Sequence, residues 1–285
     1  MTAKRKMRRA TMNNVFLNGI CRPWNIHAPS FLAMSLRVLG DAKGGVSLSQ
    51  WREKFSQFVP QRQNMAVDPN GIAHISVHGT LFNKEAPYFV AGYGGTDYDE
   101  ILTDLKKANS DDNVKGVFLS IDSCGGHACG NDRVAQAVTH CNKPVFAYSD
   151  GMCCSAAYAI AAGASYIASS PDSTVGSIGT ILPLMDVSGL WEAMGVKPDY
   201  ITNTEGTLKA AGYPPSQSAE ERASLQSETQ SFFELFKSHV NTYRDVKKED
   251  MRGQAFVGNS ALKAGLVDEI CDKNSAYNKL CILTR

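Results

Sequence analysis

The sequence predicts an α/β fold built on a mostly parallel β-sheet with right-handed βαβ crossovers. Two observations support this prediction. Apolar runs of strand length at 116–122 and 144–148 are of the kind that a parallel sheet buries on both faces. Segments with apolar residues at helical spacing alternate with such runs between residues 72 and 168.

Length and composition fit one α/β domain with extensions. The chain has 285 residues, of which 43% are hydrophobic and 20% are charged. The formal net charge of +1 argues against a dedicated nucleic-acid-binding protein. Polar residues interrupt every apolar stretch before it reaches membrane-spanning length, so we expect no contact with a membrane.

Cysteine usage indicates a reducing compartment. The eight cysteines form no CxxC pair, and a chain of this size needs no disulfide framework, so we expect reduced thiols and a cytoplasmic protein. Several potential metal ligands cluster between residues 124 and 141, but their spacing fits no familiar zinc pattern. We therefore expect neither a metal nor a cofactor.

The N-terminal part, residues 1–66, reads as a separate arm. Its basic start, with Lys4, Arg5 and Lys6, lacks the continuous apolar core of a signal peptide. Two short helices are predicted at 30–40 and 51–58. We expect the main domain to span 67–275 and a C-terminal tail to span 276–285.

Within the domain the elements are expected in the following order. A strand at 72–78 stops at Gly79 and is followed by a loop and a helix that starts near Tyr98. Next come, in order, a strand at 116–122, a helix at 130–141, a strand at 144–148, a slim helix from Ser155, a strand at 166–168 and a glycine-punctuated turn at 174–180. The remaining elements are a strand at 199–203, a long helix capped by Ser218 and Glu221, a short helix at 261–264 and a strand at 266–270.

Ser155 is the first candidate for chemistry. It lies near the start of the small-residue run at 151–164, where the first turn of a helix has free N–H groups and a positive dipole end. In parallel sheets the strand-end loops converge, so Ser155 and the loop at 123–126 are expected at one edge. The alternative is a buried helix with an incidental serine, and this segment alone leaves both interpretations open.

A serine nucleophile needs a base and an oxyanion site. His127 is the histidine placed to approach Ser155, but no G-x-S-x-G motif surrounds the serine. Lys209, among small and apolar neighbours, is an alternative base if it is desolvated; otherwise it is a solvated lysine. The N–H groups of Gly125, Gly126 and Ala156 could form an oxyanion hole, although the two glycines also fit a tight turn before the next helix.

Together these segments resemble the protease IV (SppA, signal peptide peptidase) family. The resemblance rests on the motifs at 122–126, 150–158 and 174–179 followed by Lys209, and extends from about Ile72 to about Ile270. Members are Ser–Lys peptidases with a ClpP/crotonase-like fold. The resemblance implies Ser155 as nucleophile and Lys209 as general base, with oxyanion donors at Gly125, Gly126 and Ala156.

The sequence departs from the family pattern at three cysteines. Cys124 stands where the family usually has proline, and Cys153 and Cys154 replace small alanines. Cys154 adjoins the matched serine, but we interpret Cys153 and Cys154 as packing residues. In single-domain relatives the lysine can come from a neighbouring subunit, which implies a ring-like homo-oligomer with composite active sites.

Within the family, the basic arm, the segment 22–26 and the lack of a membrane anchor favour the phage and prophage branch. These are head-maturation proteases that cut scaffold, capsid and portal proteins in the prohead, inside the host cytoplasm. No Ala/Glu/Lys-rich extension precedes Arg285, so a scaffold is expected as a separate protein. The alternatives are a bacterial signal-peptide-peptidase-like protease, a crotonase-like acyl-CoA enzyme and a non-proteolytic assembly protein.

Overall fold

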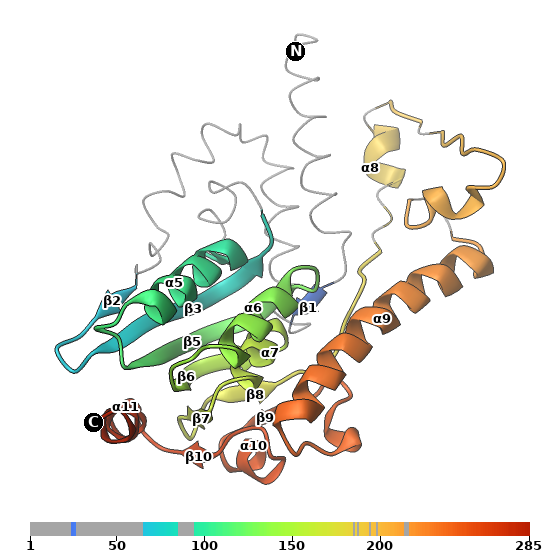
Figure 1. Cartoon of the computed structure of the whole chain (residues 1–285). Coiled ribbons are helices and arrows are strands. Elements are labelled where there is room, and N and C mark those ends of the chain that lie inside the picture. Colours follow the sequence, from blue (N-terminus) through green and yellow to red (C-terminus); the bar gives the residue numbers. More distant parts are fainter. Residues whose placement is uncertain are drawn as a thin grey trace.

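The computed structural model describes residues 24–26, 65–84 and 94–285, apart from 185, 187, 194, 198 and 214–216. The helices predicted at 30–40 and 51–58 lie outside the described residues. A mixed β-sheet, parallel along its centre, forms the middle of the molecule, with helices on both faces (Figure 1). Its main strands follow the order β10-β7-β6-β5-β3-β2. The predicted fold class is confirmed.

Four parallel strands form the centre of the sheet. They are β3 (Ile72–Phe82), β5 (Gly116–His127), β6 (Val145–Cys154) and β7 (Tyr166–Ser169). The first three extend further toward their C-terminal ends than predicted. The prediction that the first strand stops at Gly79 is wrong, because Gly79 takes a left-handed φ of 64° and absorbs a register shift, after which pairing with β5 resumes.

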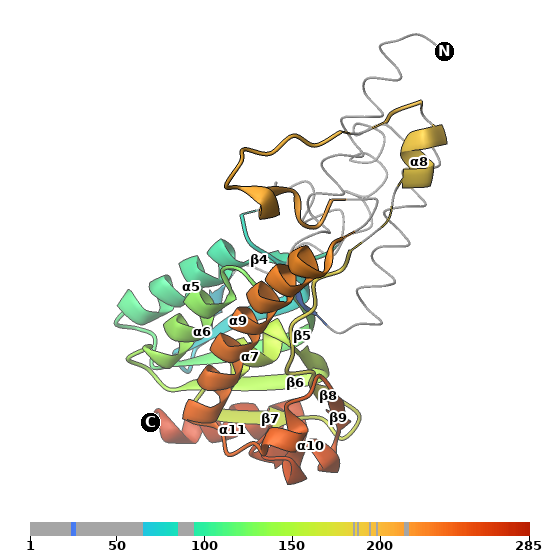
Figure 2. The same cartoon turned by 90° about the vertical axis from the view of Figure 1, so that its right-hand side faces the viewer.

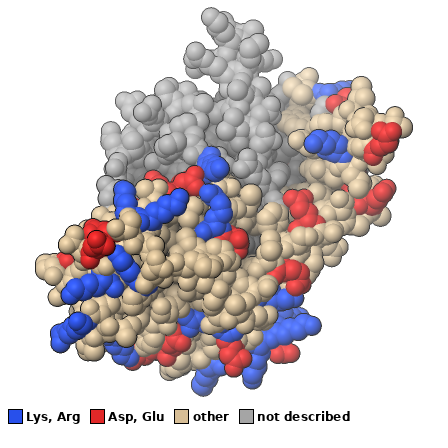
Figure 3. Space-filling model, in the orientation of Figure 1, with Lys and Arg blue, Asp and Glu red and all other residues tan. Residues whose placement is uncertain are grey.

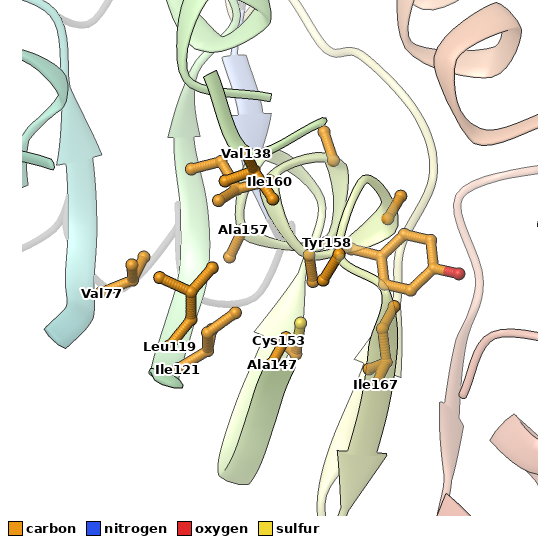
Figure 4. Packing of buried hydrophobic residues seen from close by; sticks show 14 of the residues in the cluster. Val77, Leu119, Ile121, Val138, Ala147, Cys153, Ala157, Tyr158, Ile160 and Ile167 are labelled. Atoms are coloured by element: carbon orange, nitrogen blue, oxygen red, sulfur yellow. The ribbon is translucent and has the colours of Figure 1, made fainter. Parts of the chain in front are cut away.

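One face of the sheet is covered by α5 (Tyr98–Ser110), α6 (Asn131–Thr139) and α7 (Ala156–Ala162). Alternate residues of the strands, among them Val77, Leu119 and Ile121, pack against these helices (Figure 4). The small side chains of α7 let this helix lie close to the strands, as the alanine-rich sequence predicts. The core thus forms directly beneath the helix that follows Ser155.

The opposite face is covered by α11 (Lys273–Leu283). Ala276 and Leu280 are buried against Phe118 and Phe146, which point away from the first face. Most of the ten residues expected to form a C-terminal tail therefore belong to a helix that packs on the sheet. The amphipathic signal of this helix is weak, which explains why the sequence did not reveal it.

Short strands extend the sheet at its margins. β2 (Ala66–Val67) and β4 (Thr96–Asp97) pair with β3, while β8 (Thr174–Gly176) pairs with β6 and with β9 (Ala255–Val257). β10 (Glu269–Ile270) follows α10 (Asn259–Lys263) and pairs with β7. Last, β1 (Trp24–Ile26) pairs with the C-terminal end of β5.

A long helix, α9 (Ala219–Tyr243), begins with the predicted capping box. Ser218 Oγ accepts the N–H of Glu221, and the Glu221 carboxylate accepts the N–H of Ser218. Only the C-terminal half of α9 packs against the body, through residues such as Phe236 and Val240. A 3-10 turn, η2 (Lys248–Asp250), follows it.

The described residues between 181 and 213 form a projecting arm that carries α8 (Ser188–Ala193) and the 3-10 turn η1 (Thr207–Ala210). The arm and the N-terminal half of α9 extend away from the sheet in both cartoon views (Figures 1 and 2). The strand predicted at 199–203 is wrong: these residues adopt no strand, and Ile201 is 94% exposed. In the part of the chain that the structure describes, this segment has no neighbouring strand with which to pair.

The surface in Figure 3 mixes acidic and basic side chains, in keeping with the formal net charge of +1. Among the described helices, none is long and apolar enough to cross a membrane. Within the same part of the chain, no group of three or more His, Cys, Asp or Glu side chains could hold a metal ion.

Candidate active site

The candidate nucleophile and the candidate oxyanion glycines lie at the ends of neighbouring strands. Pairing between β5 and β6 ends at Ser123 opposite Cys153. Beyond that pair, β6 runs directly into Ser155, the N-cap residue of α7, while β5 continues through Gly125 and Gly126. The topology therefore brings the serine and both glycines to the same edge of the sheet.

Ser155 has a strained backbone. Its φ of 56° and ψ of −118° are rarely adopted by residues other than glycine. Its N–H donates to the carbonyl of Gly176 at 2.7 Å, and its carbonyl accepts the N–H of Ala159 at 2.9 Å. These bonds hold Ser155 in a sharp turn between strand and helix, the kind of turn that presents the nucleophilic serine in the α/β-hydrolase fold.

The hydroxyl of Ser155 is not used to cap the helix. It lies 3.5 Å from the carbonyl of Gly179, a weak hydrogen bond at best, and the residue is fully buried. Gly176 and Gly179 both belong to the glycine-punctuated motif at 174–179. The structure thus gives this motif a role that the sequence did not reveal: the carbonyl of Gly176 holds the serine turn in place.

The cysteines beside Ser155 are packing residues. Cys153 and Cys154 are both buried, and Cys154 Sγ lies 3.4 Å from the carbonyl of Thr174. Burial raises the pKa of the Cys154 thiol to about 12 and that of Cys153 well above its ordinary value. Because the thiolate is the reactive form, neither cysteine is suited to be a nucleophile at neutral pH.

Gly125 and Gly126 end a strand; they do not form the tight turn considered as an alternative. Gly125 has a φ of 97°, which only glycine adopts without strain. A Cβ on Gly126 would lie 1.9 Å from the carbonyl oxygen of Leu81, so any side chain is excluded there. Both glycines therefore have a backbone reason to be glycine, independent of any chemistry.

Ser123 supports this strand end and was missed as a site residue. Its buried hydroxyl donates to the carbonyl of Gly79 at 2.6 Å and accepts the N–H of Gly125 at 3.1 Å. The N–H expected to serve an oxyanion is therefore engaged in this structure. The available signal was the position of Ser123 inside the motif at 122–126, two residues before the first glycine.

Asp122 supports the neighbouring strand end. Its Oδ1 accepts the N–H of Met152 at 3.0 Å. A Cβ on Gly151 would lie 2.3 Å from the same oxygen, so a glycine at 151 makes room for the carboxylate. Asp122 thereby ties β5 to the residues that lead into Ser155. In the sequence, only the position of Asp122 within the motif at 122–126 points to this role.

His127 does not have the geometry of a base for Ser155. The ring is buried, and its Nδ1 accepts the N–H of Asn83 at 3.1 Å. Phe82 packs edge-on against the same ring, with 5.5 Å between centroids. An Nδ1 that accepts a hydrogen bond leaves the proton of the neutral imidazole on Nε2, where it donates instead of accepting.

Lys209 is not brought to Ser155 within one chain. It lies in η1, its side chain is exposed, and its N–H donates to Gly206 within the same turn. The turn packs against α9. Figures 1 and 2 show the arm that carries η1, drawn in orange beyond the N-terminal end of α9, well away from α7.

Comparison with family models points to peptidases. The model of peptidase family S49 matches residues 137–284, which include α7 and the projecting arm. The model of the Clp protease family matches residues 73–175, which include the central parallel strands. The two matches overlap at Ser155 and together cover nearly the whole described domain.

Three curated relatives illustrate the range of similar proteins. "Protease 4" of Haemophilus influenzae is 29% identical over 243 residues, which cover 83% of this chain and 38% of the relative. "Capsid assembly protease C" of Escherichia phage lambda is 31% identical over 216 residues, covering 73% and 48%. "Head-tail preconnector protein GP5" of Enterobacteria phage P21 is 32% identical over 218 residues, covering 73% and 42%. The chain thus spans less than half the length of each.

Proposed function

The chain belongs to peptidase family S49, and from this premise we propose that it is a serine endopeptidase with a Ser155–Lys209 dyad. The observation that carries the proposal is the strained turn at Ser155, which lies beside the glycine-bearing end of β5. A serine at such a turn is held ready to react, because strain of this kind persists where function requires it.

In the proposed reaction, the Ser155 hydroxyl attacks the carbonyl carbon of the scissile peptide bond while neutral Lys209 accepts its proton. The N–H groups of Gly126 and Ala156 stabilise the negative charge on the tetrahedral oxygen, and Gly125 joins them if its N–H leaves Ser123. Lys209 then protonates the departing amine. In the second half of the reaction, neutral Lys209 accepts a proton from the water that attacks the acyl-enzyme and returns it to the Ser155 oxygen as the ester bond breaks. The reaction needs no metal or cofactor.

We further propose that Lys209 acts on the Ser155 of a neighbouring subunit in a homo-oligomer. The exposed position of Lys209 on the projecting arm supports this arrangement, because a lysine becomes a base only when its charged form is disfavoured by burial. Large apolar side chains of the arm and α9 are exposed in the single chain: Ile201 at 94%, Tyr213 at 48% and Leu235 at 60%. A second copy that covers them would also desolvate Lys209.

The proposed substrates are scaffold, capsid and portal proteins of a phage or prophage head, cut in the host cytoplasm. The names of the two phage relatives support this role. A cellular protease that degrades signal peptides is the second candidate, supported by the similarity to a protein named Protease 4. Cleavage of a co-expressed scaffold protein would favour the first.

The dyad is tested with S155A and K209A. Ser165→Ala, at an exposed site after α7, and Lys197→Ala, on the same arm as Lys209, are matched controls. We expect the kcat for β-casein cleavage to fall at least about 1000-fold in each dyad variant, which is the effect of removing one member of a catalytic pair. The controls should retain wild-type rates. If S155A and K209A cleave like wild type, the dyad is wrong.

A further inference from the structure

The strand β1 (Trp24–Ile26) occupies a particular edge of β5. Every strand has two hydrogen-bonding edges. At Gly125 and Gly126, one edge of β5 pairs with Thr80 and Leu81 of β3. At the same two glycines, β1 pairs antiparallel through Ile26 and Asn25. β1 therefore takes the edge opposite β3.

That opposite edge is the one on the nucleophile side. Up to Ser123 it is paired with β6, which ends its pairing at Cys153 and turns into Ser155 two residues later. β1 thus takes the place of β6 along β5 as soon as β6 leaves for α7. In the close-up of this region the pale blue β1 ribbon runs beside the C-terminal end of β5 (Figure 4).

The direction of β1 carries its chain toward the serine turn. Trp24 pairs with His127, and Ile26 pairs with Gly125, so the strand advances toward the Ser123–Cys153 pair that precedes Ser155. Ser155 is itself fully buried. A peptide carbonyl can therefore reach its hydroxyl only after a neighbouring segment moves away.

We propose that Trp24–Ile26 is an intramolecular competitor of the substrate, bound as an antiparallel strand on the edge of β5 where an extended peptide must lie to reach Ser155. The inference rests on the proposed function, because it takes the ligand to be a peptide. Added strands bind through main-chain hydrogen bonds, so one edge accepts both this segment and a substrate of unrelated sequence. The glycines of β5 leave the approaching backbone unobstructed.

The competitor is held by tethering more than by affinity. A three-residue strand makes few ladder bonds, but its attachment to the same chain gives it a high effective concentration. A substrate that pairs with β5 over a longer stretch displaces such a segment. Weakly binding peptides do not displace it, so we expect only peptides that bind tightly to β5 to be cleaved.

The test removes the ladder bonds of β1 without shortening the chain. Asn25→Pro and Ile26→Pro are compared with Asn25→Ala and Ile26→Ala, all in the S155A background so that nothing is cleaved. Both prolines are needed because successive N–H groups point to opposite edges, and proline removes only its own. Two readouts are used: hydrogen exchange of the backbone amides at 123–128, and binding of fluorescein-labelled β-casein by anisotropy.

We expect at least one proline variant to exchange faster at 123–128 and to bind β-casein about tenfold more tightly than its alanine control, equivalent to about 1.4 kcal/mol. If both proline variants match their controls in exchange or in affinity, the competitor proposal is overturned. Failure of the proposed function is separate, since it would show as absent β-casein cleavage by the protein with Ser155 intact.

Discussion

Replacing Ser155 by glycine is expected to give a more stable protein than replacing it by alanine, while both changes abolish activity. Ser155 has a φ of 56° and a ψ of −118°, and a residue with a Cβ in such a region costs up to about 3 kcal/mol. Glycine relieves this strain. Two costs oppose this gain. Ordering the more flexible glycine backbone on folding costs on the order of 1 kcal/mol, and loss of the buried Cβ costs about 0.8 kcal/mol. With the strain at the upper end of its range, as for a left-handed φ combined with this ψ, the net gain for S155G over S155A is about 1 kcal/mol.

The comparison with S155A isolates the backbone, since both variants lose the hydroxyl and its weak bond to Gly179. The assay is urea unfolding followed by circular dichroism, with the melting temperature as a second measure. We expect S155G to melt about 2–4 °C above S155A, the shift that 1 kcal/mol produces in a domain of this size. An S155A variant as stable as S155G, or more stable, would refute the claim that the serine turn is strained.

Three further predictions follow, two on residues of the candidate site and one on a carboxylate at the opposite end of β3. G126A places a Cβ 1.9 Å from the Leu81 carbonyl and should destabilise the protein by on the order of 3 kcal/mol in urea unfolding. C154A should keep β-casein cleavage within about threefold of wild type, because the thiol only packs; a loss like that of S155A would contradict this. Burial raises the pKa of Asp68, but hydrogen bonds from Tyr277 and other donors outweigh it and lower that pKa to about 2. This stabilisation is present above pH 4 and lost as the pH falls toward 2, so D68N should cost about 1–2 kcal/mol at pH 7 and flatten acid unfolding over that range.

The sequence predicted the elements that are defined by local pattern. The apolar runs became β5 and β6, and the small-residue run after Ser155 became α7. The Ser218 capping box was confirmed, and it was predictable because both of its hydrogen bonds lie within one turn of helix. Such signals need no knowledge of distant parts of the chain.

The remaining features depend on contacts between distant residues. A glycine in the pattern predicts the end of a strand, but β3 continues past Gly79. It does so because β5 pairs with β3 on both sides of the register shift at Gly79. Residues 199–203 have a strand-like composition yet pair with none of the described strands, since they lie on the projecting arm. The pairing of β1 with β5 joins residues about a hundred positions apart and has no local signature.

The candidate site was predictable to the same extent. Ser155, Gly125 and Gly126 lie at the edge where a parallel sheet collects its strand ends, as expected. The support from Ser123 and Gly176 was not predictable, because hydroxyl and carbonyl contacts of this kind leave no spacing pattern. Lys209 lies on the projecting arm, and no local pattern in the sequence indicates how far that arm holds it from Ser155.

The most direct test of the dyad across subunits is complementation between two inactive variants. S155A and K209A are co-expressed with different tags, and the mixed oligomers are purified through both tags. If Lys209 serves the Ser155 of a neighbour, mixed oligomers contain sites with both groups intact. Random assembly then gives about one quarter of the wild-type β-casein activity in a large ring and about one half in a dimer. Mixed oligomers as inactive as either variant alone would contradict a composite site.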